Sequence, residues 1–336
     1  MDLSRIFLKD ACKTSIGGQA VMEGVMMRGI KRTAIAIRIP DGRIHVKTKP
    51  NKKQGAWAKI PLIRGVVAFV SSLVGGTGWL LYSADVLEHY MGEEEETPGK
   101  FEQKLIDRFG EKAVWNFMIY LSVIFSLIVG IGVFMLLPTV FVNVLKGVTK
   151  SPIVLNLVEG VLRILIFLVY ILCIRRMEDI RRVFMYHGAE HKSIHCFENG
   201  LDLTVDNAKQ FYTLHPRCGT SFLMFVMIIS LILFSLLGWP SLAMRIVSRL
   251  VLIPVIAGLS YEILRWAGRS DSALVKVLSM PGLYLQKLTT AEPDPDQLQV
   301  GLVSLKAVLV ADDAQYIEGI CDEDGNLISE EIIDNR

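Results

Sequence analysis

Long apolar runs constrain the fold of this chain more than any other feature of its sequence. Four of them are about as long as the ~20 residues that a helix needs to cross a lipid bilayer: residues 114–145, 153–174, 221–239 and 245–264. The first run contains no charged residue, and the second is interrupted only by Glu159 and Arg163. The sequence therefore predicts a mainly α, polytopic helical membrane protein, and the hydrophobic fraction of 51% agrees with this.

A fifth apolar segment, residues 61–84, is more mixed: it contains Arg64, several serines and three glycines in four positions, which are Gly75, Gly76 and Gly78. Lysine and arginine favour cytoplasmic loops, so their distribution indicates which segments cross. If only the four runs cross, three parts of the chain face one side and hold 18, 7 and 6 of the 36 basic residues: residues 1–113, 175–220 and 265–336. We therefore expect four spans, cytoplasmic N and C termini, and a re-entrant or interfacial segment at residues 61–84.

This topology divides the chain into seven parts. The first three parts are a cytoplasmic Gly-rich and β-hairpin region (1–60), the re-entrant or interfacial helix (61–84) and a cytoplasmic linker with an amphipathic helix (85–113). A first transmembrane hairpin (114–174) is followed by a cytoplasmic loop rich in His, Glu and Cys (175–220) and a second transmembrane hairpin (221–264). The last part is a cytoplasmic tail with a helix and an acidic end (265–336). The predicted fold is thus a four-span bundle with a small cytoplasmic α+β portion.

The cytoplasmic ends of the chain carry weaker signals. Apolar and polar residues alternate on both sides of Asp41-Gly42, which predicts a β-hairpin. The residues expected on its strands are Ile35, Ile37, Ile39, Ile44 and Val46. Near the other end, residues 294–309 have helical spacing, and the last 25 residues are acidic, which predicts a loose tail.

A Gly-rich stretch, IGGQAVMEGVMMRG, precedes the hairpin and places Glu23 and Arg28 among four glycines. Such a stretch can cradle a phosphate group through its backbone N–H groups, or it can form a tightly packed turn. It lacks the ending of a P-loop and the spacing of a dinucleotide fingerprint. We therefore expect the turn.

The segment YHGAEHKSIH, residues 186–195, contains three of the six histidines of the chain. Nothing before Gly188 breaks a helix, so His187 and His191 lie one turn apart on one helical face, with Glu190 beside them. This is the H-x-x-E-H pattern of inverted zincins, in which two imidazoles hold zinc and the glutamate takes a proton from water. The segment predicts a divalent metal site, zinc before other ions, with Glu190 as the general base.

Further ligands are available in the same loop. His215 and Cys218 stand in H-x-x-C spacing just ahead of the third apolar run, and Glu198 is another oxygen donor. Four protein ligands would close a tetrahedral, structural site, whereas three ligands and a water molecule would make a catalytic one. A metal-free polar network of the same residues is the third alternative, and the sequence alone does not decide among them.

Two charged residues near the loop are additional candidates. Arg217 suits an anionic substrate group or a lipid headgroup, or the carbonyl groups of a helix end. Glu262, near the inner end of the fourth run, could supply a further carboxylate. The five cysteines are odd in number and mostly cytoplasmic in this topology, so we expect no disulfides. We expect the lipid bilayer and no nucleic acid as a partner, although the net charge of +2 is uninformative about nucleic acid.

Three stretches resemble the bacterial YqhQ-like membrane proteins, a family of unknown function often labelled a predicted metal-dependent enzyme: GGQAVMEGVMMRG, the loop from YHGAEHK to HPRCGTSF, and PGLYLQKLTTAEPD. The likeness runs from Ser15 to Leu309, whereas His195 and Cys196 lie outside its pattern. The positions that match are Gly18, Glu23, Gly24, Arg28, Gly29, His187, Glu190, His191, Glu198, His215, Arg217 and Cys218. The resemblance implies an integral membrane protein and no particular substrate.

Two hypotheses from different classes follow. The first is a metal-dependent hydrolase at the cytoplasmic face of the bacterial inner membrane, acting on a membrane-protein peptide or a lipid. Its metal would be held by His187, His191 and one of His215, Cys218 and Glu198. The second is a non-catalytic membrane scaffold or assembly factor, braced by a structural metal or by a polar network. Neither the substrate nor the oligomeric state can be predicted from the sequence.

Overall fold

The computed structural model describes residues 6, 11–12, 14–51, 55–92, 99–145, 147–149, 151–238, 241–268, 270, 272–309, 318–322 and 324–333. The described chain forms two compact units. The first unit comprises residues 1–91, 171–229 and 246–336, and the second comprises residues 92–170 and 230–245.

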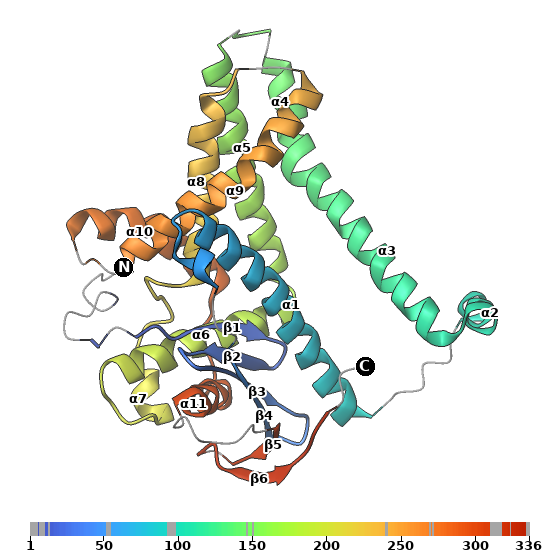
Figure 1. The fold of residues 1–336 in the computed structure, drawn as a ribbon, viewed down its shortest axis with the longest axis vertical. Coiled ribbons are helices and arrows are strands. Elements are labelled where there is room, and N and C mark those ends of the chain that lie inside the picture. Colours follow the sequence, from blue (N-terminus) through green and yellow to red (C-terminus); the bar gives the residue numbers. More distant parts are fainter. Residues whose placement is uncertain are drawn as a thin grey trace. The chain divides into compact units, whose positions relative to one another are not determined.

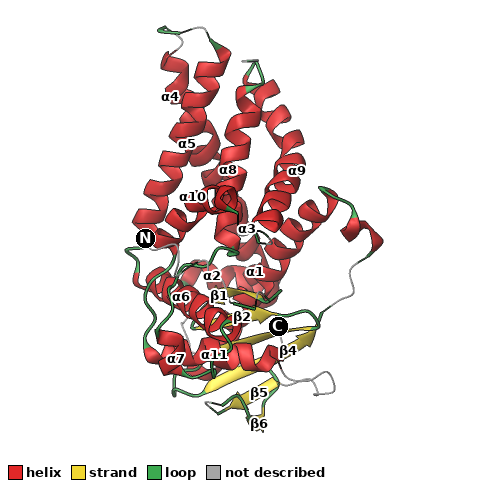
Figure 2. Ribbon diagram, turned by 90° about the vertical axis from the view of Figure 1, so that its left-hand side faces the viewer, coloured by secondary structure: helices red, strands yellow, loops and turns green. Residues whose placement is uncertain are grey.

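Six antiparallel strands form the sheet of the first unit (Figures 1 and 2). Their order in the sheet is their order in the chain: β1 (Gly17–Val21), β2 (Gly24–Arg28), β3 (Arg32–Arg38), β4 (Ile44–Pro50), β5 (Glu318–Cys321) and β6 (Leu327–Glu330). Each strand pairs with its neighbour along the chain, although β4 and β5 are far apart in sequence. Among the described strands, β1 and β6 are therefore the two edges.

The predicted hairpin around Asp41-Gly42 is confirmed. β3 and β4 pair with Ile37 opposite His45, and Gly42 turns the chain with a φ of 89°. The Gly-rich stretch forms a second hairpin, β1–β2, whose turn holds Glu23 at a φ of 49°. The stretch is thus a tight turn, as we expected.

Helices cover both faces of the sheet. α1 (Ile63–Met91) packs on one face through an apolar cluster made of Val21, Met26, Ile35, Ile37, Ile39, Tyr82, Val86 and Leu87. α6 (Glu178–Glu198) and α11 (Pro295–Leu309) lie side by side on the other face (Figures 1 and 2). Their cluster includes Val25, Met27, Ala34, Ala36, Ile44, Val46, Tyr186, Ile194, Val300 and Val303. Successive strand residues alternate between the two clusters, as side chains of a strand must.

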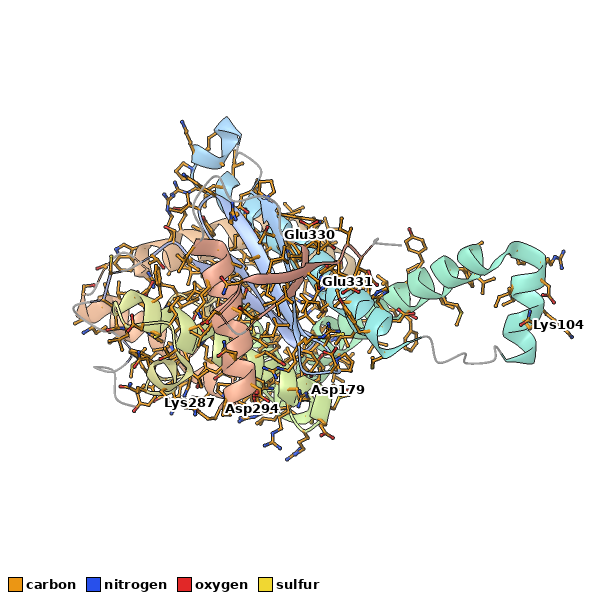
Figure 3. All side chains as sticks on the ribbon, turned by 90° about the horizontal axis from the view of Figure 1, so that it is seen from below. Lys104, Asp179, Lys287, Asp294, Glu330 and Glu331 are labelled. Carbon is orange, nitrogen blue, oxygen red and sulfur yellow. The ribbon has the colours of Figure 1, made fainter. Side chains whose placement is uncertain are left out.

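α11 confirms the predicted helix at residues 294–309. Asp294 caps it, because the Gln297 N–H donates to Oδ1 of Asp294 at 2.8 Å. The Gln297 side chain returns the contact by accepting from the Asp294 N–H at 3.1 Å. Asp294 is labelled in Figure 3, just ahead of the helix. The short helix α7 (Val205–Lys209) lies against both α6 and α11.

α1 is one unbroken helix of 29 residues, so a re-entrant path for residues 61–84 is wrong. A chain that dips into a membrane and returns needs a break, and the described helix has none. Its first turns lie close to α9 (Leu242–Ala267), where a Cβ on Gly65 would come within 2.9 Å of the Cα of Gly258. Near its other end, Ser83 accepts from the Met22 N–H at 3.2 Å. The interfacial alternative stays a prediction.

Four described helices are long and apolar enough to cross a membrane, which indicates a multi-pass membrane protein: Ile63–Met91, Tyr120–Leu145, Pro152–Ile174 and Val247–Ala267. The last three fall on the first, second and fourth apolar runs. The first run forms α3 (Glu111–Ile131), the π-helical turn η3 (Gly132–Leu136) and α4 (Leu137–Leu145), and the second forms α5 (Pro152–Ile174). The third run forms α8 (Gly219–Ser235), whose 17 residues are fewer than a typical span needs.

Three further helices complete the described secondary structure. They are η2 (Ala56–Lys59), α2 (Lys100–Phe109) and α10 (Ala273–Thr289). α2 is the expected amphipathic helix, and Gly110, with a φ of 83°, separates it from α3.

A buried carboxylate lies among the apolar helices of the second unit. Glu159 is 1% exposed and accepts hydrogen bonds from Thr139 and Arg163, both at 3.0 Å. Arg245 lies 3.6 Å from the second carboxylate oxygen. A charge inside an apolar helix is costly unless it is paired, and these contacts supply the pairing.

The acidic end of the chain is not loose where the structure describes it, so that prediction is wrong for residues 318–322 and 324–333. β5 pairs with β4, and the carboxylate of Glu318 accepts from the ammonium group of Lys47 at 2.8 Å in the protein interior. This contact joins residues 271 positions apart, which local patterns cannot show. β6 forms an exposed edge whose end carries Glu330 and Glu331, labelled in Figure 3.

Candidate metal centre

α6 carries the H-x-x-E-H residues on a face that is turned into the protein. Glu178 and Asp179 stand in its first turn, where acidic residues favour a helix start. The helix then continues unbroken past the motif, as its apolar spacing predicts. His187, Glu190 and His191 are 8%, 5% and 1% exposed, so their polar atoms must find partners inside the protein.

The ring of His187 is oriented by a backbone carbonyl. Its Nδ1 atom lies 2.8 Å from the carbonyl oxygen of Thr289, which can only accept, so Nδ1 carries the proton. Nε2 therefore presents a lone pair, and it lies 3.1 Å from the Sγ of Cys218. The chain can pass this close to α6 because residue 188 is glycine: a Cβ there would collide with the carbonyl oxygen of Ala291.

His191 is oriented in the same way. Its Nδ1 donates to the carbonyl oxygen of Thr213 at 2.5 Å, which leaves the lone pair on Nε2. That Nε2 is buried and has no hydrogen-bond partner among the described residues. Burial lowers the pKa of His191, which keeps the ring neutral, as metal binding requires. A buried polar atom without a partner is rare and calls for an explanation such as an ion or a water molecule.

The three donor atoms of His187, His191 and Cys218 all lie within 4.8 Å of one another. Zn–N bonds of about 2.0–2.1 Å and Zn–S bonds of about 2.3 Å put the ligand atoms of a tetrahedral site ~3.3–3.7 Å apart. The triad fits such a site after small side-chain adjustments. Both histidines also donate their other N–H to a backbone carbonyl, which is the usual arrangement around ligating histidines.

Cys218 is suited to the third position because its Sγ lies beside the two imidazole nitrogens and contacts Thr220. Burial raises the pKa of Cys218, whereas the hydrogen bonds from Thr220 lower it. The Thr220 N–H lies 3.4 Å from Sγ, and the Thr220 hydroxyl lies 3.2 Å from it. The thiolate is the form that binds metal.

Glu190 lies beside the triad and against the edge strand β1. A Cβ on Gly18 would come within 2.9 Å of Cγ and Cδ of Glu190, so only glycine leaves room for the carboxyl group. Burial raises the pKa of Glu190 to about 8, against the opposing effects of His187 and of a hydrogen bond from the Gly18 backbone. A nearby cation would counter the burial effect and favour the carboxylate.

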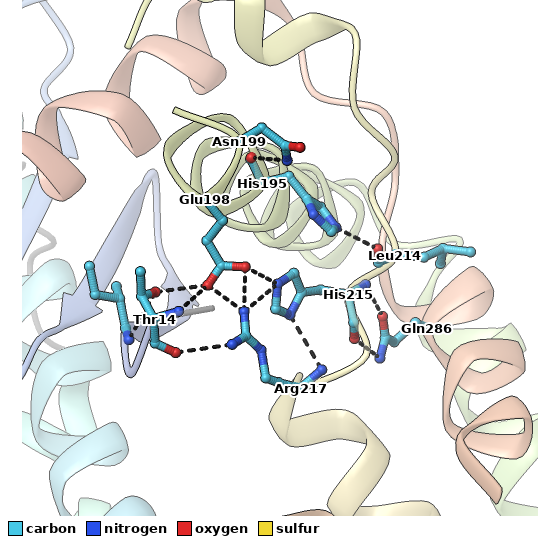
Figure 4. A network of polar contacts seen from close by, with 9 residues as sticks. Thr14, His195, Glu198, Asn199, Leu214, His215, Arg217 and Gln286 are labelled. Carbon is cyan, nitrogen blue, oxygen red and sulfur yellow. Dashed lines mark hydrogen bonds and ion pairs between the residues drawn. The ribbon is translucent and has the colours of Figure 1, made fainter. Parts of the chain in front are cut away.

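His215 and Glu198 do not join the triad but form a second polar network with Arg217 (Figure 4). The guanidinium group of Arg217 contacts both carboxylate oxygens of Glu198 and donates to the Thr14 carbonyl at 3.0 Å. Thr14 donates to Glu198 from its N–H and its hydroxyl, both at 2.8 Å. His215 Nε2 lies 3.7 Å from Glu198. Figure 4 shows Glu198 at the centre of these contacts.

The network fixes the charges of its members. Burial alone would raise the pKa of Glu198, but the neighbouring His215 and the hydrogen bonds from Arg217 and Thr14 together hold it well below its usual range. Burial lowers the pKa of His215 to about 3, so its ring is neutral at physiological pH. Glu198 and Arg217 therefore form a buried ion pair that ties the loop before α8 to the end of α6.

Gln286 holds the backbone of His215, and the His215 ring centre lies 5.6 Å from that of His191. The His215 N–H donates to the side-chain oxygen of Gln286 at 2.8 Å, and its carbonyl accepts from the same amide at 2.9 Å (Figure 4). The ring then packs against His195, with ring centres 4.6 Å apart. His195 itself lies 3.0 Å from the Leu214 carbonyl, so it belongs to this network as well.

The remaining candidates lie in other contacts. Glu23 receives both guanidinium donors of Arg182 and the Tyr186 hydroxyl, so it joins the β1–β2 turn to α6. Glu262 pairs with Arg64 at the start of α1 and is not among the converging donors of the triad. Arg28 ends β2 and is exposed.

Several residues that shape the site were not singled out in the sequence. Thr213 and Thr289 act only through backbone carbonyls, which leave no signature. Gln286 holds the His215 backbone from 71 positions away. Thr14 lies just ahead of the Gly-rich stretch. Gly18, inside that stretch, was among the positions that match the family, and a glycine in a strand often marks a close approach to another group.

Comparisons with known proteins agree with the motifs. The family described as a protein of unknown function, DUF1385, matches residues 60–311. The chain is 35% identical over 301 residues to the uncharacterized protein YqhQ of Bacillus subtilis (strain 168), across 87% of this chain and 92% of that protein. No solved structure matches the chain. The chain therefore belongs to the DUF1385 family of YqhQ-like proteins, as the resemblance of its motifs predicted.

Proposed function

We propose that this protein is a metal-dependent hydrolase of the cell membrane, with its metal, most simply zinc, held at the cytoplasmic face by His187, His191 and Cys218. The single observation that carries the proposal is the convergence of two oriented imidazole lone pairs and a thiol, one imidazole nitrogen having no other partner among the described residues. The substrate would be a peptide or a lipid that reaches the centre from the membrane or the cytoplasm.

Connectivity supports the expected topology. The sheet, α6 and α11 pack against one another around one apolar core, so they lie on one side of the membrane. The chain therefore crosses an even number of times between β4 and α6, and again between α6 and α11. If the run through α3 and α4 crosses and α5 returns, α1 does not cross and lies at the surface. α8 and α9 then cross as a pair, and both termini lie on the sheet side, which the basic residues assign to the cytoplasm.

The number of protein ligands favours a catalytic metal site over a structural one. A structural zinc site uses four protein ligands, whereas a catalytic site uses three and keeps one position for water or substrate. Three donors converge here, and His215, which could have been the fourth, is held in the Glu198 network instead. Glu190 is adjacent and is not among the converging donors, so it is available for proton transfer.

The chemistry assigned to the residues is hydrolysis of an acyl bond. When bound, zinc supplies Lewis acidity, which lets water attack at neutral pH. Glu190 accepts the proton of the attacking water as the C–O bond forms. It then returns that proton to the leaving nitrogen or oxygen as the scissile bond breaks, so the carboxylate is regenerated. Burial of Glu190 suits both steps, because it holds the proton affinity of the carboxyl group near neutrality.

The rival is a scaffold with a braced loop, and one pair of variants separates the two. Glu190→Gln keeps the shape of the side chain and removes the base. We expect this variant to keep its zinc and to lose about 100-fold or more in hydrolysis of a pool of internally quenched peptides and of phospholipid vesicles. Glu178→Gln, an exposed position on the same helix, is the matched control and should keep both properties. A scaffold would show no hydrolysis in either variant or in the parent protein.

A further inference from the structure

We infer that the substrate of this centre is an extended peptide, which adds as a seventh strand to the free edge of β1. The inference rests on the proposed function and names its substrate class. Among the described strands, β1 pairs with β2 alone, so its other edge is open to a further strand. That edge runs past Glu190, whose carboxyl group lies against Gly18.

The register of β1 shows which backbone groups face the open edge. Gly18 lies opposite Met27 and directs its N–H to the Glu190 carboxyl group, so this N–H points away from β2. Outward and inward groups alternate along an antiparallel strand. The N–H and carbonyl of Ala20 therefore also point outward. A peptide beside β1 can pair with Ala20 and continue past Gly18, where the catalytic glutamate stands.

The distances suit this placement. A neighbouring strand lies about 4.8 Å from β1 in the plane of the sheet. The carboxyl group of Glu190 lies in contact with the backbone at Gly18, on the side of the sheet that α6 covers. A strand at that spacing would carry its own peptide bond past Glu190 within hydrogen-bond reach. The ladder would thus hold the substrate at Ala20 and present a bond for cleavage near Gly18.

The side chains of β1 leave the edge open. Gly17 and Gly18 are exposed, and a Cβ on Gly17 would meet no atom within 4 Å. Gln19 is turned to the opposite face, where its amide donates to the Gly76 carbonyl of α1 at 3.3 Å. The other edge strand, β6, ends in acidic residues, which discourage pairing with another chain. The edge beside the metal centre has no such protection.

A lipid would not use these features. Alternating N–H and carbonyl groups at a strand edge match the alternating groups of an extended peptide and give main-chain affinity without a defined side-chain sequence. An acyl chain has neither group to offer. The edge therefore favours a peptide over a lipid as the substrate.

The test is an N-methyl scan of a peptide, with the protein unchanged. The zinc-loaded Glu190→Gln variant in lipid nanodiscs is screened against a randomised decapeptide pool, and one binding sequence is resynthesised with a single N-methyl group at each residue in turn. Strand addition predicts that methylation weakens binding about tenfold at alternate residues and has little effect at those between. The inference is overturned if methylation weakens binding without this alternation. It is also overturned if no peptide binds while the parent protein hydrolyses phospholipid vesicles.

Two protein variants complete the test. Ala20→Pro removes the outward N–H, and Gly17→Ala, its control on the same strand, keeps every N–H and adds a Cβ that meets no atom within 4 Å. We expect the proline variant to keep its zinc and to bind the decapeptide about tenfold more weakly, whereas Gly17→Ala binds normally. Equal binding by both variants overturns the inference. The proposed function is judged separately, by whether the parent protein with zinc cleaves the same peptide. If N-methylation weakens binding at alternate residues but the peptide is not cleaved, β1 is a peptide-binding edge and the proposed hydrolase function is wrong.

Discussion

The Nε2 atom of His187 and the Sγ atom of Cys218 lie 3.1 Å apart, although 31 positions separate the two residues. The orientation of the His187 ring is fixed, because its other nitrogen, Nδ1, donates to the Thr289 carbonyl. His191 repeats the arrangement with the Thr213 carbonyl. Backbone carbonyls thus orient both imidazole rings through Nδ1, and the two Nε2 atoms lie near the Cys218 thiol. These three side chains are the metal ligands that we propose.

Gly18→Ala should impair catalysis without removing the metal. The added Cβ would lie 2.9 Å from the Glu190 side chain and 2.6 Å from the Met26 carbonyl, so the carboxyl group must move. Displacing a catalytic group by about 1 Å can cost about 100-fold in rate, and we expect a loss of that order in kcat with zinc content unchanged.

Gly17→Ala is the matched control for this change. A Cβ at that position meets nothing within 4 Å, and the residue is an exposed neighbour on the same strand. Its activity should equal that of the parent protein. Equal activity of both alanine variants would contradict the assigned position of Glu190.

Breaking the Glu198–Arg217 pair should destabilise the protein more than removing it. Arg217→Met leaves the buried Glu198 carboxylate without its cation, which typically costs about 3–5 kcal/mol. The double variant Glu198→Gln, Arg217→Met removes both charges and should recover part of that loss. Thermal unfolding in detergent measures both.

An exposed ion pair supplies the comparison. Lys209 and Asp206 lie 3.8 Å apart with side chains 47% and 95% exposed. Asp206→Asn should change the free energy of unfolding by less than about 1 kcal/mol. If the double variant is less stable than Arg217→Met, the buried pair does not stabilise the loop in the way described.

His45 should make the protein less stable as the pH falls. Its side chain is buried beneath α1, where Nε2 lies 2.8 Å from the Tyr82 hydroxyl, and burial lowers the pKa of His45 to about 4. The unfolded chain takes up this proton near pH 6.5. Between about pH 6.5 and pH 4 the unfolded state therefore binds more protons, and the free energy of unfolding falls by roughly 1 kcal/mol per pH unit on account of this residue.

His45→Gln removes this contribution and keeps a hydrogen-bonding side chain. The difference in stability between the parent protein and the variant should be constant above about pH 7 and should shift in favour of the variant as the pH falls to about 4. Chemical denaturation across that range measures it. A difference that does not change with pH would show that His45 is not buried as a neutral ring.

The topology can be checked by thiol labelling. In a background with the exposed Cys12 and Cys173 changed to serine, single cysteines replace Asp41, Glu330 and Val148. Asp41 and Glu330 lie on the sheet, and Val148 lies between α4 and α5. We expect an impermeant reagent to label Val148→Cys in intact cells and the other two only after the membrane is opened. Labelling of all three from the same side would contradict the topology.

Local patterns predicted the elements whose signals lie within one stretch of sequence. The β3–β4 hairpin follows from alternation around Asp41-Gly42, and α6 follows from its unbroken helical spacing. The helical spacing also places His187 and His191 on one face. Cys218 could be singled out because its motif stands just ahead of an apolar run.

Contacts between distant parts of the chain account for what could not be predicted. His215 carries the same motif as Cys218, yet Gln286 holds its backbone so that the ring faces Glu198. The acidic tail contributes β5, which pairs with β4 of the β3–β4 hairpin and places Glu318 against Lys47. Neither partner can be identified from spacing, since each lies far along the chain and its type is common.

The metal content of the full chain tests the central claim most directly. The protein is purified in detergent without chelators, its metals are quantified, and the ligands are identified by X-ray absorption spectroscopy. The account predicts about one zinc ion per chain, bound by two imidazole nitrogens and one sulfur, and lost in Cys218→Ser. Only trace metal in the parent protein, or a metal whose coordination contains no sulfur, would contradict it.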